Sequence, residues 1–362
     1  MFYHLLYPLR ELFFGFNIFR YITFRAAMAA VTAFALSMLL GPALIRKLSE
    51  LKVGENIRKN ECPGLYPLHK GKEGTPTMGG ILILLSIIGS TLLWGDLTNQ
   101  YVMLVIFATA WLGIIGFADD YIKLVKKRSL GLNPRLKFLW QLLLGLIIGV
   151  TVSYDPIIGG RLDVPFFKEL VVNLGIFYSI FAALVIVGSS NAVNLTDGLD
   201  GLAIGCIIMV ALAYSGMSYL TGHIRFSSYL NILHVPGVGE LTVFCASIVG
   251  AGLGFLWYNT YPASVFMGDT GALALGGAIG VVAVLIKKEL VLLLVGGIFV
   301  AEAVSVILQV GSYKLRRKRI FLVAPVHHHF QLKGWAEPKV TVRFWIIGAV
   351  LALLSLATLK IR

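Results

Sequence analysis

Long apolar runs recur along the chain, and short polar segments separate them. A helix needs about 20 predominantly apolar residues to span roughly 30 Å of hydrocarbon. Runs of about this length cover residues 26–45, 77–94, 101–118, 138–153, 171–190, 202–221, 241–258, 270–286, 290–310 and 344–359. The pattern predicts an all-α polytopic integral membrane protein with about ten transmembrane helices, forming a single domain over residues 1–362.

Two further elements are predicted outside these runs. The first 25 residues combine arginines with many aromatic side chains, which is typical of a helix lying in the membrane interface. Residues 154–170 contain IIGG followed by RLDVPFF, which predicts a small periplasmic hairpin turning at Gly159 and Gly160. No disulfide is predicted from the three cysteines, since Cys206 and Cys245 fall inside predicted spans and Cys62 lies in a loop.

Composition supports the membrane class and charge orients it. With 57% hydrophobic and 14% charged residues, the chain cannot form a soluble globule with a polar exterior. The connections after the first, third and ninth runs carry 21 of the 31 basic residues. Because basic loops stay on the cytosolic side, these connections are predicted to be cytosolic and both termini extracytoplasmic.

Five of the eight aspartates lie where predicted helices meet cytosolic turns: Asp119, Asp120, Asp197, Asp200 and Asp269. Carboxylates at a membrane boundary are costly to desolvate, so a cluster of them needs a cationic partner. Aspartate oxygens favour Mg²⁺ over zinc, and Mg²⁺ commonly bridges carboxylates to substrate phosphates. The pattern therefore indicates a membrane phosphotransferase that uses Mg²⁺.

Two of these motifs also fit a purely structural interpretation. Asp119 and Asp120, in GFADDYIK, also fit a solvated acidic start to a basic loop, paired with Lys123 and Lys126 at helical spacing. Asp269, in VFMGDTGALALGG, also fits the N-cap of the helix that follows it.

The segment SSNAVNLTDGLDG places Asn191, Asn194, Asp197 and Asp200 at intervals of three. Amides both donate and accept hydrogen bonds, and carboxylates accept from hydroxyl or imide groups, so the set suits a nucleoside. The same residues also fit a capped helix junction satisfied by its own backbone.

Three adjacent histidines, His327, His328 and His329, stand in APVHHHFQLKGW beside Lys333. Adjacent residues do not comfortably reach one tetrahedral zinc ion, so phosphate binding is the preferred interpretation. The basic segment YKLRRKRIF just before them is interpreted as topology-setting charge and anionic-lipid contact. Glu302, inside the ninth run, fits either a functional or a helix-packing residue and is not placed in the active site.

Five motifs together resemble a known family: HKGKEGTPTMGGILI, GFADDYIK, NAVNLTDGLDGLA, VFMGDTGALALGG and PVHHHFQLKGW. In this order and spacing they resemble bacterial phospho-N-acetylmuramoyl-pentapeptide transferases (the MraY family), a branch of the polyprenyl-phosphate N-acetylhexosamine-1-phosphate transferases. The resemblance implies transfer of phospho-MurNAc-pentapeptide from UDP-MurNAc-pentapeptide to undecaprenyl phosphate. Lipid I and UMP would form, with Mg²⁺, at the cytosolic face of the bacterial inner membrane during peptidoglycan synthesis.

The same resemblance implies roles for single residues. Asp269 would bind the metal, Asp119 would be the base for the lipid phosphate, and Asp120 would lie close to the metal and the phosphates. With His328 they make up the expected catalytic set. The expected substrate-binding residues, with the Phe266 ring stacked on uracil, are Lys72, Thr77, Lys137, Asn191, Asn194, Asp197, Asp200, Asn259, Phe266, His327 and His329.

Alternatives remain open at this stage. A related enzyme that moves GlcNAc-1-phosphate would share the fold, metal and aspartates. A transporter of a phosphorylated substrate would place its site near the midplane between repeated halves, whereas these motifs crowd one surface. The sequence does not decide between direct attack by the lipid phosphate and a mechanism with an aspartyl intermediate. It also leaves open the peptide stem, the lipid chain length and the oligomeric state, a homodimer included. Membrane lipids are expected partners, and nucleic acid is not.

Overall fold

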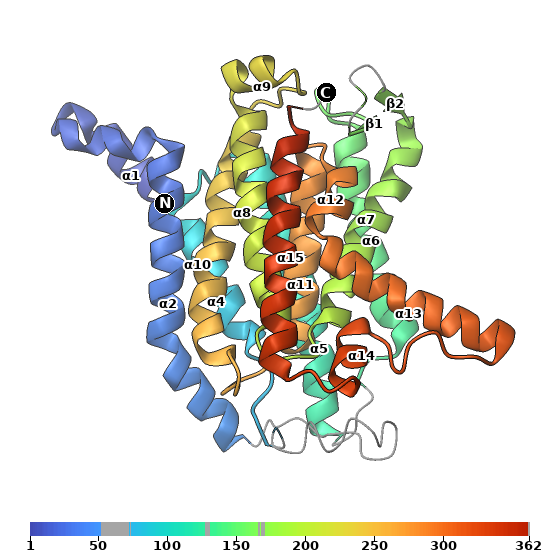
Figure 1. The fold of residues 1–362 in the computed structure, drawn as a ribbon. Helices are drawn as coiled ribbons and strands as arrows, with labels where there is room; N and C mark the ends of the chain where they lie inside the picture. The colour runs from blue at the N-terminus through green and yellow to red at the C-terminus, as the bar shows by residue number, and fades with distance from the viewer. Residues whose placement is uncertain (52–71, 73, 127–130, 166, 168–170, 361–362) are drawn as a thin grey trace.

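The computed structural model describes residues 1–51, 72, 74–126, 131–165, 167 and 171–360 (Figure 1). The loop position predicted for Cys62 lies outside this part of the chain. The same is true of several of the basic loop residues, namely Lys52, Arg58, Lys59, Lys70, Lys127 and Arg128.

Helices account for nearly all of the regular structure. They are α1 (Phe2–Leu6), η1 (Tyr7–Glu11), η2 (Phe14–Arg20), α2 (Ile22–Glu50), α4 (Gly80–Trp94), α5 (Gln100–Val125), α6 (Pro134–Ser153), η4 (Gly175–Phe177), α7 (Tyr178–Thr196), α8 (Leu202–Gly222), α9 (Ile224–Leu230), η5 (Val238–Glu240), α10 (Leu241–Asn259), α11 (Gly268–Leu285), α12 (Glu289–Val295), α13 (Gly297–Arg316), α14 (Val326–Leu332) and α15 (Glu337–Thr358). Within the described residues, nine helical stretches are long and apolar enough to cross a membrane, and the shorter α4 occupies the second predicted run. The predicted all-α polytopic class is confirmed.

Helix α11 lies at the centre of the bundle. It packs against α4, α5, α7 and α8, and every residue from Thr270 to Leu285 is buried. Its sequence is rich in glycine and alanine, whose small side chains allow neighbouring backbones to approach closely. The position of its first turn is therefore set by the helices that surround it.

The ninth predicted run, residues 290–310, is not one continuous helix. Helix α12 ends at Val295 and α13 begins at Gly297, after the cap residue Gly296. Two consecutive glycines weaken a helix, because glycine loses the most backbone freedom on folding. Helix α13 then leaves the bundle at a steep angle (Figure 1).

The N-terminal segment forms three short helices, α1, η1 and η2, rather than the one interfacial helix predicted. Pro8 stands at the start of η1 and lacks the N–H that a continuing helix would use. The middle of the segment projects from the bundle (Figure 1), but its beginning contacts the end of α4. The Met1 amino group donates to the Leu92 carbonyl at 2.7 Å, and the Phe2 ring centroid lies 5.0 Å from that of Trp94.

The small hairpin is present, but its turn is not where the sequence predicted it. Strands β1 (Arg161–Asp163) and β2 (Val171–Asn173) pair antiparallel, with Leu162 opposite Val172. The two glycines of IIGG lie before β1, and the connection between the strands comes after Asp163. The Gly159 carbonyl accepts a hydrogen bond from Lys287 Nζ at 2.9 Å. Burial lowers the pKa of Lys287 to about 8.

A buried ion pair joins α2 to the start of α10. The Arg25 guanidinium, 1% exposed, donates to both carboxylate oxygens of Glu240 at 2.7 and 2.5 Å, and also to the Trp94 carbonyl at 3.3 Å. A two-point contact of this kind fixes the mutual orientation of the helices. It lies at the end of α10 opposite to Asn259.

Arg25→Met is expected to lower the free energy of unfolding by about 3 to 5 kcal/mol, because it leaves the Glu240 carboxylate buried without its partner. Thermal unfolding of the detergent-purified protein measures this loss. Arg25→Met combined with Glu240→Leu should recover much of it, since no unpaired charge remains. Unfolding of the single variant at the wild-type temperature would contradict this role.

Candidate active site

Three carboxylates converge where α5 ends and α11 begins. Carboxylate oxygens of Asp119, Asp120 and Asp269, here called the aspartate cluster, all lie within 4.8 Å of one another. Asp119 and Asp120 are only 3% and 4% exposed. The alternative of a solvated acidic start to a loop is therefore wrong.

Asp120 binds the first turn of α11. Its Oδ1 accepts a hydrogen bond from the Asp269 amide at 3.2 Å, and its Oδ2 accepts from the Thr270 amide at 2.9 Å and the Thr270 hydroxyl at 2.7 Å. The N–H groups of a helix's first turn have no partner within the helix, and they favour such a negative charge. Asp120 thus positions Asp269, and the two adjacent aspartates have different contacts.

Asp269 is not the N-cap of α11, as the alternative interpretation proposed. The helix begins at Gly268 with Met267 as its cap residue, so Asp269 lies inside the first turn. Gly268 has a φ of 72°, and a Cβ atom at this residue would lie 2.7 Å from Asp120 Oδ2. Only glycine satisfies both the left-handed backbone and the close approach.

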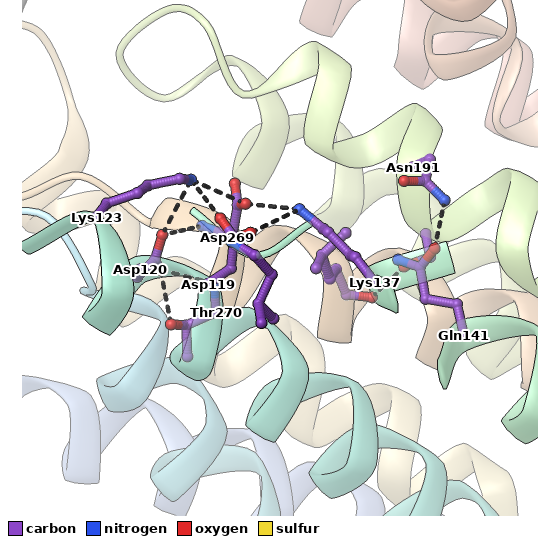
Figure 2. Close-up of polar contacts among 11 residues, drawn as sticks. Asp119, Asp120, Lys123, Lys137, Gln141, Asn191, Asp269 and Thr270 are labelled. Carbon is purple, nitrogen blue, oxygen red and sulfur yellow. Dashed lines mark hydrogen bonds and ion pairs between the residues drawn. The ribbon is translucent and has the colours of Figure 1, made fainter. Parts of the chain in front are cut away.

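Two lysines neutralise part of the aspartate cluster (Figure 2). Lys123 Nζ lies 2.6 Å from Asp119, 3.6 Å from Asp120 and 3.0 Å from Asp269. Lys137 Nζ lies 2.7 Å from Asp269 and 3.9 Å from Asp119. The predicted pairing of Lys123 with its helix neighbours is confirmed, but its contact with α11 could not be read from spacing within one helix.

The aspartate cluster fits a hard divalent cation. Three carboxylates face two ammonium groups, which leaves one negative charge uncompensated. Oxygen donors at this spacing suit Mg²⁺, which needs few protein ligands because it retains water and binds phosphates. In the described part of the chain, no other group of His, Cys, Asp or Glu has this spacing, and the three histidines do not form one.

A second ionic cluster, missed in part by the sequence reasoning, joins Lys72, Asp200 and Glu337; we call it the lysine–carboxylate cluster. Lys72 Nζ donates to Asp200 Oδ1 at 2.6 Å and to Glu337 Oε1 at 2.5 Å. Glu337 begins α15, in the stretch between the basic YKLRRKRIF segment and the run predicted at 344–359. An acidic residue in the first turn of a membrane helix was the signal that could have identified it.

The segment between α10 and α11 connects the two clusters. Asp200 Oδ2 accepts a hydrogen bond from the Ala263 amide at 3.0 Å. Asn259 Oδ1 accepts from the Gly201 amide at 3.0 Å, while Asn259 Nδ2 donates to the Val265 carbonyl at 2.8 Å. Phe266 follows, with its ring centroid 5.8 Å from Lys72 Nζ.

Other predicted substrate residues lie around this segment. Thr77 is next to the start of α11, because its Oγ1 would be 3.0 Å from a Cβ at Gly268. Asn194 and Asp197 are half-buried, at the last turn and C-cap of α7. Asn191 donates to Gln141 Oε1 at 2.8 Å and to its own helix, so its amide also ties α6 to α7 (Figure 2).

The three histidines have three different environments. His327 is buried, with Nδ1 3.2 Å from Glu302, and a Cβ at Gly198 would lie 2.3 Å from its Nε2. Glu302 therefore packs against the histidine segment, and that segment lies against the turn between α7 and α8. His328 Nδ1 lies 2.8 Å from Gln331 Oε1.

His329 accepts a hydrogen bond at Nδ1 from the Leu322 amide at 3.1 Å. Burial, with the Lys333 charge nearby, lowers the pKa of His329. A ring nitrogen that accepts a hydrogen bond is unprotonated, so the contact with Leu322 indicates that Nδ1 carries no proton. The expectation that His329 binds phosphate stays a prediction, in which its Nε2 would be the donor.

Comparison with known proteins agrees with the motifs. Residues 102–287 match glycosyl transferase family 4, and residues 72–84 match the phospho-N-acetylmuramoyl-pentapeptide-transferase signature 1. The chain is similar to the phospho-N-acetylmuramoyl-pentapeptide-transferases of Syntrophus aciditrophicus (54% identical over 363 residues), Citrifermentans bemidjiense (54% over 362) and Desulfatibacillum aliphaticivorans (56% over 366). Each alignment covers 100% of this chain and 100% of the relative. By this full-length identity, the chain belongs to the phospho-N-acetylmuramoyl-pentapeptide transferase family.

Proposed function

We propose that this chain transfers phospho-MurNAc-pentapeptide from UDP-MurNAc-pentapeptide to undecaprenyl phosphate, giving lipid I and UMP for peptidoglycan synthesis. The names of its relatives and the signature at residues 72–84 support this activity. The structural observation that carries the proposal is the convergence of the aspartate cluster with Lys123 and Lys137 at the ends of two membrane-length helices.

The site is proposed to face the cytosol from the bacterial inner membrane. The aspartate cluster lies at the end of α5 that leads into the basic segment KLVKKR, and basic loops favour the cytosolic side. A position at helix ends also argues against a transporter, whose site belongs near the bilayer midplane. Both substrates then have access, because the nucleotide is water-soluble and the lipid phosphate lies at the membrane surface.

Mg²⁺ is the proposed cofactor, held by the aspartate cluster with Asp269 as its principal ligand. The donor oxygens and the uncompensated negative charge described above support this assignment. When bound, the ion would neutralise the charge that develops on the phosphates during transfer.

The nucleoside is proposed to bind between Phe266 and the turn that carries Asp197 and Asp200. Phe266 follows a segment that hydrogen bonds with Asn259 and Asp200 hold in place, so the backbone that carries its ring is fixed. Uracil can stack on such a ring. Asn194, Thr77 and the histidine segment, with His328 at its centre, are proposed to complete this side of the site.

Asp119 is proposed to accept the proton of the lipid phosphate. Its Oδ1 already accepts a hydrogen bond from the Leu132 amide at 3.0 Å, which orients the carboxylate. An oxygen of the lipid phosphate forms a bond to the sugar-linked phosphorus of the donor. The bond from that phosphorus to the bridging oxygen breaks, and UMP leaves with the electron pair. Lys123 and Lys137 offset the charge on the phosphates.

The activity is tested by giving the detergent-purified protein UDP-MurNAc-pentapeptide, undecaprenyl phosphate and Mg²⁺, and following UMP. Release should stop when any one component is withheld. Replacing the donor with UDP-GlcNAc separates the proposed enzyme from a GlcNAc-1-phosphate transferase, and efficient turnover of UDP-GlcNAc would refute the proposed donor.

Asp269→Ala should lower the rate of UMP release by about 100-fold or more at saturating Mg²⁺, since it removes the principal metal ligand. Glu289→Gln, which changes a buried carboxylate at the opposite end of α11, is the control for a general loss of charge. Near-normal turnover by Asp269→Ala would rule out the metal assignment.

Phe266→Ala should raise KM for UDP-MurNAc-pentapeptide by about tenfold, because stacking of a base on an aromatic ring contributes about 1 to 3 kcal/mol. KM for undecaprenyl phosphate should change little. Phe266→Tyr retains the ring and should stay close to wild type. An unchanged donor KM in Phe266→Ala would count against stacking.

A further inference from the structure

Glu337 is the one member of the lysine–carboxylate cluster that the motifs did not identify as a substrate-binding residue. Its Oε1 accepts hydrogen bonds from Lys72 Nζ at 2.5 Å and from the Asp200 amide at 2.8 Å. One oxygen atom therefore links a side chain of one segment to the backbone of another. Glu337 is buried, so water competes little for these bonds.

The contact belongs to a larger docking of α15 onto the turn between α7 and α8. Thr341 Oγ1 donates to the Asp200 carbonyl at 3.3 Å, and Trp345 Nε1 donates to the Gly201 carbonyl at 3.1 Å. Glu337, Thr341 and Trp345 are spaced four apart and share one face of α15. Three successive turns of this helix thus hold the same short segment.

The charges of the cluster decide what Lys72 can do. Two carboxylates, from Asp200 and Glu337, lie within 2.6 Å of one ammonium group, so the cluster carries a net negative charge. A phosphate placed against Lys72 would also meet both carboxylates. Neutral groups that donate hydrogen bonds, such as ribose hydroxyls or the uracil imide, suit these acceptors better.

We infer that Glu337 is a positioning residue for the nucleoside, because it holds Lys72 and Asp200 in place. Lys72 then bridges the two carboxylates and does not bind phosphate. The inference rests on the proposed function, because it assigns this cluster to the nucleoside end of the UDP-linked donor. The phosphates are left to the aspartate cluster and its two lysines.

The sign of one KM change tests the inference. Glu337→Gln keeps the shape of the side chain but removes its charge, and should raise KM for UDP-MurNAc-pentapeptide about tenfold, the effect of losing one charge-assisted hydrogen bond. KM for undecaprenyl phosphate and kcat should stay within about twofold. If Lys72 binds phosphate and Glu337 merely restrains it, the donor KM falls instead. A lowered or unchanged donor KM overturns the inference.

A double substitution separates positioning from a general loss of structure. Lys72→Met alone leaves two buried carboxylates facing each other and should raise the donor KM. Adding Glu337→Gln removes that repulsion, so the double variant should have a donor KM no higher than Lys72→Met. If the two effects multiply, Glu337 does not act through Lys72 and the inference is wrong.

The matched control is Glu240→Gln, the same change in a buried carboxylate that binds Arg25 at the far end of α10. It should lower thermal stability and leave both KM values unchanged. Failure of the proposed function would appear as absence of turnover in the wild-type protein. Failure of the inference would appear as normal wild-type turnover with a donor KM that Glu337→Gln does not raise.

Discussion

The hydrogen bonds from the start of α11 to Asp120 are the interaction on which the site depends. α11 is buried from Thr270 to Leu285, so water has little access to the amides of its first turn, and these free N–H groups need an acceptor from the protein. Asp120 supplies it from α5 and thereby places Asp269 beside Asp119. The same contact requires Gly268, because any Cβ there would meet the Asp120 carboxylate.

Charge compensation organises the rest of the site into two regions with different chemistry. The aspartate cluster has more acid than Lys123 and Lys137 can neutralise, which suits a divalent ion and phosphates. The lysine–carboxylate cluster has its own cation, bound on both sides, and offers acceptors to a neutral ligand. The segment from Asn259 to Phe266 joins the two regions, so one ligand with a neutral and a charged end can span both.

The helices outside the centre support this arrangement from three directions. α15 docks onto the turn after α7 through three of its own turns. α13 contributes Glu302 to the environment of His327, which explains a buried carboxylate in a membrane helix as a packing partner of the histidine segment. α6 carries Lys137 toward Asp269 and meets α7 through Gln141 and Asn191.

The amino-acid sequence by itself determined the membrane class and the position of nearly every long helix, since a run of apolar residues must leave water wherever the rest of the chain lies. It also identified Asp119, Asp120 and Asp269 as candidates, because acidic residues are conspicuous in so apolar a chain.

Only the tertiary structure decided which groups meet. The contacts of Lys123 with Asp269, of Glu337 with Lys72 and of Lys287 with Gly159 join residues more than a hundred positions apart, and local periodicity carries no information about such pairs. The break at Gly296 is likewise set only in part by the sequence. The glycines permit a break there, but packing against other helices sets the direction that α13 takes.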